Sequence, residues 1–83
     1  MMIVVNVTVP ALEKVYNMNL EEKAEVSDLI AEIAGLISQK EHMELQGNIR
    51  EMVLASKDLG IVLGRNQTLQ DYGILTGAEL LIV

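Results

Sequence analysis

The sequence predicts an α+β domain in which a mixed sheet of about five strands carries one long helix across one face. Two segments near the start alternate apolar and polar residues with the period of half-buried strands. A later segment changes to the helical period, and the remainder holds short apolar runs between turn signals. The 83 residues provide for one small domain, residues 1–83.

The first strand is expected over residues 2–9, which are rich in β-branched side chains. Alternation gives it one apolar face and one mixed face, the first made by Ile3, Val5, Val7 and Val9, the second by Val4, Asn6 and Thr8. Pro10 ends this strand because proline has no N–H for a strand ladder. Residues 15–20 alternate in the same way and complete a hairpin, with Tyr16, Met18 and Leu20 on one face.

An amphipathic helix is expected over residues 25–40, where the apolar positions recur three and four residues apart. These positions are Val26, Leu29, Ile30, Ile33 and Ile37. The start is weakly marked: Ser27 is the candidate cap, yet position 30 is Ile and completes no capping box. Gly35 inside the helix costs about 1 kcal/mol relative to Ala, and either it permits close packing or it has no role.

The second half of the chain reads as three short strands. Met52 and Leu54 alternate with Val53 and Ala55 in the first, and residues 58–60 form a turn before the apolar run 61–63. A short helical turn carrying Leu69 precedes a final strand with Leu80 and Ile82 inward and Leu81 and Val83 outward. The expected order is therefore β-β-α-β-β-(short helix)-β, with the helix packed across one face of the sheet.

Composition argues against several classes of partner. The chain has twelve acidic and six basic residues and a net charge of −6, which disfavours nucleic acid and anionic lipid surfaces. Tyr16 and Tyr72 are the only aromatic residues, so no base-stacking surface is available. The sequence has no run of about 18 apolar residues and no secretory signal, so we expect a cytoplasmic protein without direct membrane insertion.

The residues offer little for catalysis or for metal and cofactor binding. His42 is the single histidine and lies beside Glu41 and close to Glu44, in a segment, 41–48, that reads as a loop. One histidine without a second His or a Cys makes a weak metal site, and the chain has no cysteine nucleophile. We therefore expect no catalytic, cofactor-binding or metal-binding residues.

Residues 68–74, Thr-Leu-Gln-Asp-Tyr-Gly-Ile, resemble a signature of ubiquitin, and the element order resembles its β-grasp fold over nearly the whole chain. The resemblance implies that the ring of Tyr72 packs under a loop with its hydroxyl bonded to backbone. Conjugation of ubiquitin uses a flexible tail ending in Gly-Gly, whereas this sequence ends at Val83 in the last expected strand. We therefore expect a protein that is not conjugated.

A second resemblance is to the YukD/EsaB family of bacterial ubiquitin-like proteins. It rests on Leu69, Tyr72-Gly73-Ile74, Gly77 and Leu80, and on Tyr16-x-Met18-x-Leu20 followed by Val26-x-x-Leu29-Ile30. This resemblance implies an accessory component of a type VII (ESX-like) secretion system, whose partners are secretion components and which a protein partner recruits to the inner face of the membrane. The alternative is an auxiliary ubiquitin-like subunit of a multicomponent bacterial oxygenase.

Two surfaces are candidate binding sites. On the predicted layout, the sheet face away from the helix presents Val4, Val53, Leu81 and Val83, where a solvated sheet face would usually carry polar residues. Partner binding, homodimerisation and no role are all open for this face. The second candidate is an acidic stripe of the helix, Glu25, Asp28 and Glu32, for which a basic partner and an ordinary solvated helix face are both open.

Overall fold

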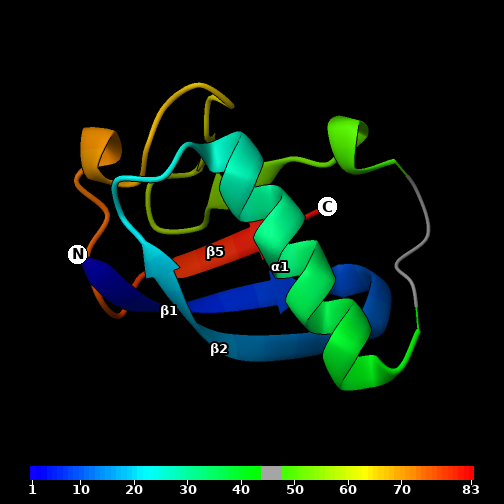
Figure 1. Ribbon diagram of the computed structural model, residues 1–83. Helices are drawn as coiled ribbons and strands as arrows, with labels where there is room; N and C mark the ends of the chain where they lie inside the picture. The colour runs from blue at the N-terminus through cyan, green and yellow to red at the C-terminus, as the bar shows by residue number, and fades with distance from the viewer. Residues whose placement is uncertain (44–47) are drawn as a thin grey trace.

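The computed structural model describes residues 1–43 and 48–83 and has the predicted α+β architecture (Figure 1). Its strands are β1 (Met2–Val9), β2 (Lys14–Glu21), β3 (Leu54–Ser56), β4 (Ile61–Val62) and β5 (Glu79–Ile82), and its long helix is α1 (Val26–Glu41). Three 3₁₀ helices lie in the connections: η1 (Pro10–Leu12), η2 (Ile49–Glu51) and η3 (Gln70–Tyr72). Half of the predicted loop 41–48, residues 44–47, lies outside the described residues, and Glu41 is the last residue of α1.

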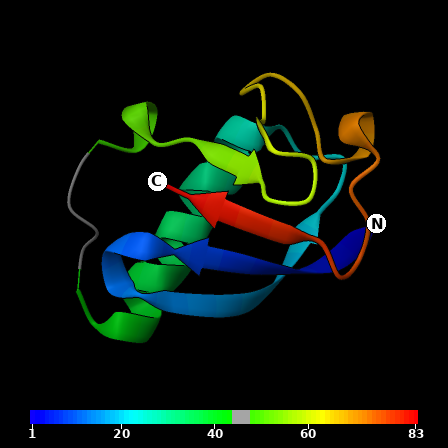
Figure 2. The same cartoon turned by 180° about the vertical axis from the view of Figure 1, so that it is seen from behind.

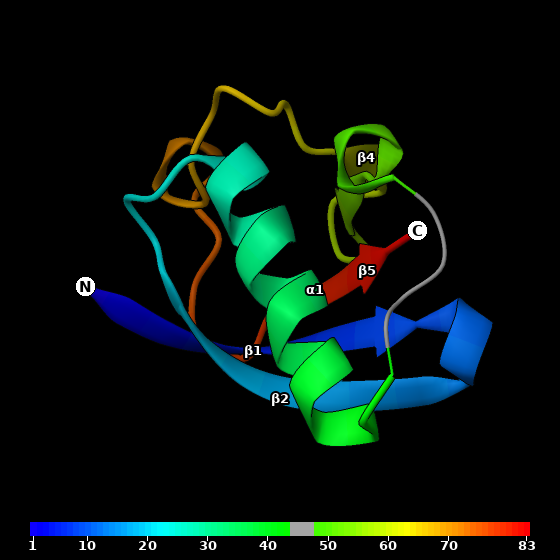
Figure 3. The same cartoon turned by 45° about the vertical axis from the view of Figure 1, so that its right-hand side comes forward.

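The five strands form one mixed sheet in the order β2-β1-β5-β3-β4. The first and last strands, β1 and β5, lie side by side in the centre and run parallel, and the other pairs are antiparallel. Helix α1 crosses one face of this sheet (Figure 3). From behind, β5, β1 and β2 face the viewer, and no element of the described chain covers them (Figure 2). We call this uncovered side the outer face.

The core lies between α1 and the inner face of the sheet, and it confirms the predicted alternation. The inward residues of β1 and β2 are at most 8% exposed, as are Leu80 and Ile82 of β5. Helix α1 contributes all five residues named from its period, each fully buried. Burial of such aliphatic side chains, at about 1.5–3 kcal/mol each, holds the helix to the sheet.

The start of α1 differs from the prediction, because Ser27 does not cap it. Glu25 occupies the capping position without a side-chain bond. The first backbone N–H groups of the helix bond to carbonyls from elsewhere in the chain. The N–H of Val26 donates to the carbonyl of Gln67 at 2.8 Å, and that of Ser27 donates to the carbonyl of Arg65 at 3.0 Å. A loop distant in sequence therefore satisfies the donors that local caps usually satisfy.

The third strand also differs in its limits. We expected it to include Met52 and Val53, but β3 begins at Leu54. Pairing with β5 still reaches back to Val53, whose N–H donates to the carbonyl of Val83 at 2.8 Å. The N–H of Val83 returns a bond to the carbonyl of Val53 at 3.1 Å. The outward side chains of this segment thus keep the predicted face, although the strand is shorter.

Candidate functional site: the outer face of the sheet

A row of side chains crosses all five strands on the outer face. It consists of Val15 on β2, Thr8 on β1, Leu81 on β5, Ala55 on β3 and Val62 on β4, each beside the next by strand register. Val15 and Val62 at the two ends are each 60% exposed, and the three residues between them are half-buried. Four of the five are apolar, which is unusual for an uncovered sheet face.

Val53 and Val83 continue this apolar surface toward the end of β5. Their two mutual backbone bonds place them opposite each other, two residues along from the pair Ala55 and Leu81. Val83 is 57% exposed and Val53 is half-buried. We define the outer apolar patch as Val53, Ala55, Val62, Leu81 and Val83. Three of the four predicted binding residues therefore fall in one continuous surface.

A polar row bounds the patch on one side. It consists of Asn17, Asn6, Glu79 and Lys57. The Asn17 amide donates to Oδ1 of Asn6 at 3.0 Å, and the Asn6 amide donates to Oε2 of Glu79 at 2.7 Å. The amino group of Lys57 reaches Oγ1 of Thr8 at 3.5 Å. These bonds order the side chains, so the patch has a defined polar border.

The structure does not bring Val4 to the other predicted residues. Val4 lies opposite Asn19 on β2, and its backbone pairs with Thr76 and Gly77. It lies four positions before Thr8 along β1, a distance of about 13 Å in a strand. Asn6 of the polar row lies between them. Val4 shares the predicted face but stands outside the outer apolar patch.

An apolar hollow of about 240 Å³ adjoins the patch at Val83. Its walls include Val9, Leu12, Met43 and Met52. Methionine side chains adapt easily to the shape of an apolar partner. The hollow extends the apolar surface around the end of β5, from the outer face toward the end of the helix.

The acidic stripe lies as predicted along the start of α1. Glu25, Asp28 and Glu32 are all exposed. The Glu25 carbonyl accepts bonds from the N–H groups of Asp28 and Leu29, so this acid stands at the start of the helix, where the helix dipole favours negative charge. Its role in binding stays a prediction.

A polar cluster joins the end of α1 to β2. Glu41 accepts a bond from the Lys14 amino group and another from the Tyr16 hydroxyl, each at 2.7 Å. These two bonds hold the pKa of Glu41 below its usual range. The hydrogen bond to Glu41, with burial and the nearby negative charge, raises the pKa of Tyr16 to about 12. Both shifts follow from bonds that fasten the helix to β2.

From the sequence, His42 was expected to be a loop residue without a catalytic or metal-binding role. His42 ends α1 with a left-handed backbone, φ 54°, and its side chain is exposed. Within residues 1–43 and 48–83, no group of three or more His, Cys, Asp and Glu side chains is placed to hold a metal ion. Glu44, its predicted acidic neighbour, lies outside the described residues. The geometry thus gives His42 the role of a helix end.

Tyr72 has the structural role that the ubiquitin resemblance implies. Its hydroxyl accepts a bond from the N–H of Gly64 at 2.8 Å, beneath the segment that follows β4. The carboxylate of Asp71 and the hydroxyl of Thr68 each accept the other's backbone N–H, at 2.9 and 3.1 Å. This corner positions Ile74 in the core and starts the approach to β5.

Among the described residues, no helix has the length and apolar character needed to cross a membrane. Among the solved structures that match 99% of this chain are three with a TM-score of 0.73 each. They are the N-terminal ubiquitin-like domain of the 4931431F19Rik protein (26% identity, 73% of that chain), the ubiquitin-like domain of Arabidopsis thaliana protein At2g32350 (24%, 76%) and Caldiarchaeum subterraneum ubiquitin (13%, 91%). These likenesses show the ubiquitin-like fold.

The family comparison is more specific than the fold. No curated protein matches the chain. Residues 4–82 match the family described as "WXG100 protein secretion system (Wss), protein YukD". That range begins at Val4 and ends at Ile82, so it contains every described strand and helix except the first two residues of β1. The chain therefore belongs to the YukD family of the WXG100 protein secretion system.

Proposed function

We propose that this protein is a non-catalytic interaction module, an accessory component of a type VII secretion system that docks other components of the machinery. The outer apolar patch carries the proposal. Contiguous exposed apolar side chains commonly mark a binding surface in a small domain. Family membership supports secretion components as the partners, and we propose that they meet this protein in the cytoplasm or at the inner face of the membrane.

The size of the patch favours a transient partner over a permanent homodimer. A standard stable interface buries roughly 800 Å² on each partner. In the patch only Val62 and Val83 are widely exposed, and the other three residues are half-buried. A partner that covers the patch and bonds to the polar row would gain a modest apolar contact with a fixed orientation.

Affinity purification from the native host, membranes included, tests the proposal. The tagged wild-type protein is compared with Leu81→Glu, which places a charge at the centre of the patch. Val4→Glu is the matched control, because it adds the same charge to the same face beyond the polar row. We expect wild type and Val4→Glu to recover secretion components and Leu81→Glu to lose about tenfold in recovery, the effect of roughly 1.4 kcal/mol.

Three other results would count against the proposal. Equal recovery of secretion components by all three proteins would support the role in secretion but show that the patch is not the binding site. Loss with both substitutions would indicate a general effect of charge on this face. Recovery of only the protein itself, with a dimer in analytical ultracentrifugation that Leu81→Glu dissociates, would assign the patch to homodimerisation.

A further inference from the structure

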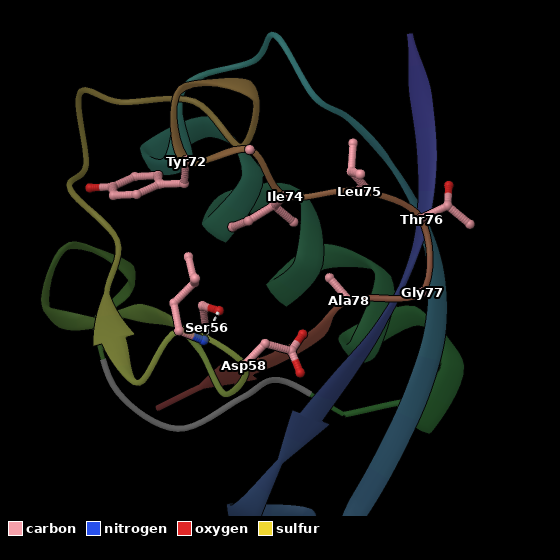
Figure 4. Close-up of a pocket in the computed structure, with 10 residues that line it drawn as sticks. Ser56, Asp58, Tyr72, Ile74, Leu75, Thr76, Gly77 and Ala78 are labelled. Carbon is pink, nitrogen blue, oxygen red and sulfur yellow. Dashed lines mark hydrogen bonds between the residues drawn. The ribbon is translucent and has the colours of Figure 1, made fainter.

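A second hollow, of about 310 Å³, lies away from the outer apolar patch. One side is formed by Ser56 at the end of β3 and by Asp58 and Leu59 in the turn that follows, and residues 72–78 before β5 form the other side. Figure 4 shows the labelled side chains of these two segments around the space, with Ser56 and Asp58 on one side and Ile74 and Ala78 on the other. The hollow and the patch share no residue.

The walls of this hollow are mostly apolar. Ile74 is buried and Ala78 is half-buried, while Leu59 at the mouth is 51% exposed. The Ser56 oxygen accepts the backbone N–H of Leu59 at 3.0 Å, and the residue is only 2% exposed, so this hydroxyl presents little polar surface to the hollow. A partner group that enters the hollow therefore meets the side chains of Leu59, Ile74 and Ala78.

One carboxylate stands at the rim of this apolar space. Oδ2 of Asp58 accepts the backbone N–H of Glu79 at 3.0 Å, which fixes the side chain beside Ala78 (Figure 4). Within the described chain, no Lys or Arg nitrogen lies within 4 Å of this carboxylate. The neighbouring Lys57 extends to Thr8 on the outer face. Asp58 thus offers its remaining oxygen to an incoming donor.

We infer that this hollow receives an arginine side chain from a basic segment of a partner protein. The aliphatic stem of arginine fits walls of hydrocarbon, and the guanidinium carries donors only and sheds water more easily than an ammonium group. The free oxygen of Asp58 is the matching acceptor, and the net charge of −6 attracts a basic segment from a distance. This surface is independent of the outer apolar patch and of its proposed role.

Nuclear magnetic resonance titration of the whole chain tests the inference directly. The probe is N-acetyl-argininamide, and the matched probe is N-acetyl-citrullinamide, which has nearly the same shape and no charge. We expect saturable, weak binding of the arginine probe, with amide shifts concentrated at Leu59 and residues 73–79. The citrulline probe should bind at least about fivefold more weakly, because the bond to Asp58 loses its charge.

Two variants locate the charge that matters. Asp58→Asn keeps an oxygen for the N–H of Glu79 and should lower the affinity for the arginine probe about fivefold. Asp71→Asn is the matched control, since Asp71 is also exposed and also accepts one backbone N–H through its carboxylate. It should leave the affinity unchanged. The amide spectra report at the same time whether each variant is folded.

Several outcomes would overturn the inference. Equal binding of the two probes would make the contact apolar only. Equal losses in Asp58→Asn and Asp71→Asn would reduce the effect to the overall negative charge. Shifts centred on α1 in place of residues 73–79 would move the site to the acidic stripe, and the absence of saturable binding would remove the site.

Discussion

At the scale of single residues, Tyr72 shows how one side chain fixes a loop. Its hydroxyl holds the N–H of Gly64, and a Cβ added to Gly64 would lie only 3.2 Å from that oxygen. The close approach favours glycine at position 64, because a Cβ there requires a small shift of the Tyr72 hydroxyl and of the Gln67 side chain, whose Cγ would also lie at 3.2 Å. The same contact places the segment between β4 and η3, which supplies the carbonyls that cap α1.

Replacing Tyr72 with Phe should lower the free energy of unfolding by about 1–2 kcal/mol, because the half-buried N–H of Gly64 loses its acceptor. Denaturation with urea measures the change. Tyr16→Phe is the control, since its hydroxyl bonds to Glu41, which keeps its bond to Lys14. A loss from Tyr72→Phe no larger than that from Tyr16→Phe would show that the Gly64 contact contributes little.

The raised pKa of Tyr16 predicts that the protein loses stability at alkaline pH. Its folded pKa of about 12 lies above the ordinary value of 10.0, so folding favours the protonated phenol. The stability from this residue is fully present below pH 10.0 and is lost as the pH rises toward about 12. The difference in tyrosinate absorbance between wild type and Tyr16→Phe measures its titration. In a Glu41→Gln background the midpoint should move back toward 10.0, and an unchanged midpoint would contradict the assigned cause.

At the scale of elements, α1 is held by contacts that come mostly from other parts of the chain. Its buried face packs on the sheet, its first N–H groups bond to the carbonyls of Arg65 and Gln67, and its last turn is tied to β2 through Glu41. Gly35 takes no part in these contacts. A Cβ built at this position meets no atom of another element within 4 Å among the described residues, so the close-packing explanation for the glycine is not supported.

Gly35→Ala should therefore raise the stability by roughly 0.5–1 kcal/mol, because alanine favours the helix and restricts the unfolded chain. Thermal unfolding followed by circular dichroism measures the shift. Gly77→Ala has open space as well, but its φ of +94° is one that an L side chain rarely adopts, so it should lower the melting temperature. Stabilisation by both substitutions, or by neither, would contradict this explanation.

At the scale of the whole molecule, the two faces of the sheet differ: α1 covers one face and encloses the core there, and the outer face is uncovered in the described chain. Ile33 is fully buried between α1 and the sheet, whereas Leu81 is half-buried on the outer face. A charge has opposite consequences at these two places. In the core it has no partner and no water, while on the outer face it remains hydrated.

We expect Ile33→Asp to unfold the protein and Leu81→Glu to leave it folded. Far-ultraviolet circular dichroism and the amide spectrum show whether each variant is folded, and they are recorded before any binding experiment. An unfolded Leu81→Glu protein would mean that the outer face is part of the core packing. That result would also remove this substitution as a test of docking.

The sequence was sufficient for the elements that depend on local periodicity. The alternation of residues 2–9 and 15–20 and the helical spacing of Val26 to Ile37 each report which side chains are buried. The cap of α1 was not predictable in this way, because Arg65 and Gln67 lie some 40 residues from it in the sequence. Hydrogen bonds to these distant carbonyls take the place of the side-chain cap that we expected from Ser27.

The candidate site was predicted in part for the same reason. Alternation along the strands correctly predicted that Leu81, Val53 and Val83 point to the outer face. The same alternation with Tyr16 also indicates an outward Val15, which we overlooked. The inclusion of Val62 and the exclusion of Val4 depend on which strands are neighbours and in what register. Periodicity assigns a residue to a face, but register between distant strands decides which residues of that face touch.

The central pairing of β1 with β5 has a consequence for synthesis on the ribosome. Asn6 and Glu79 are partners across 73 positions of sequence, so β1 emerges long before the strand that lies beside it. Until β5 leaves the exit tunnel, the hairpin of β1 and β2 has an open edge in what becomes the middle of the sheet. A nascent chain stalled before β5 is therefore expected to expose that edge to chaperones or to other stalled chains, and completion of the fold awaits translation of its final strand.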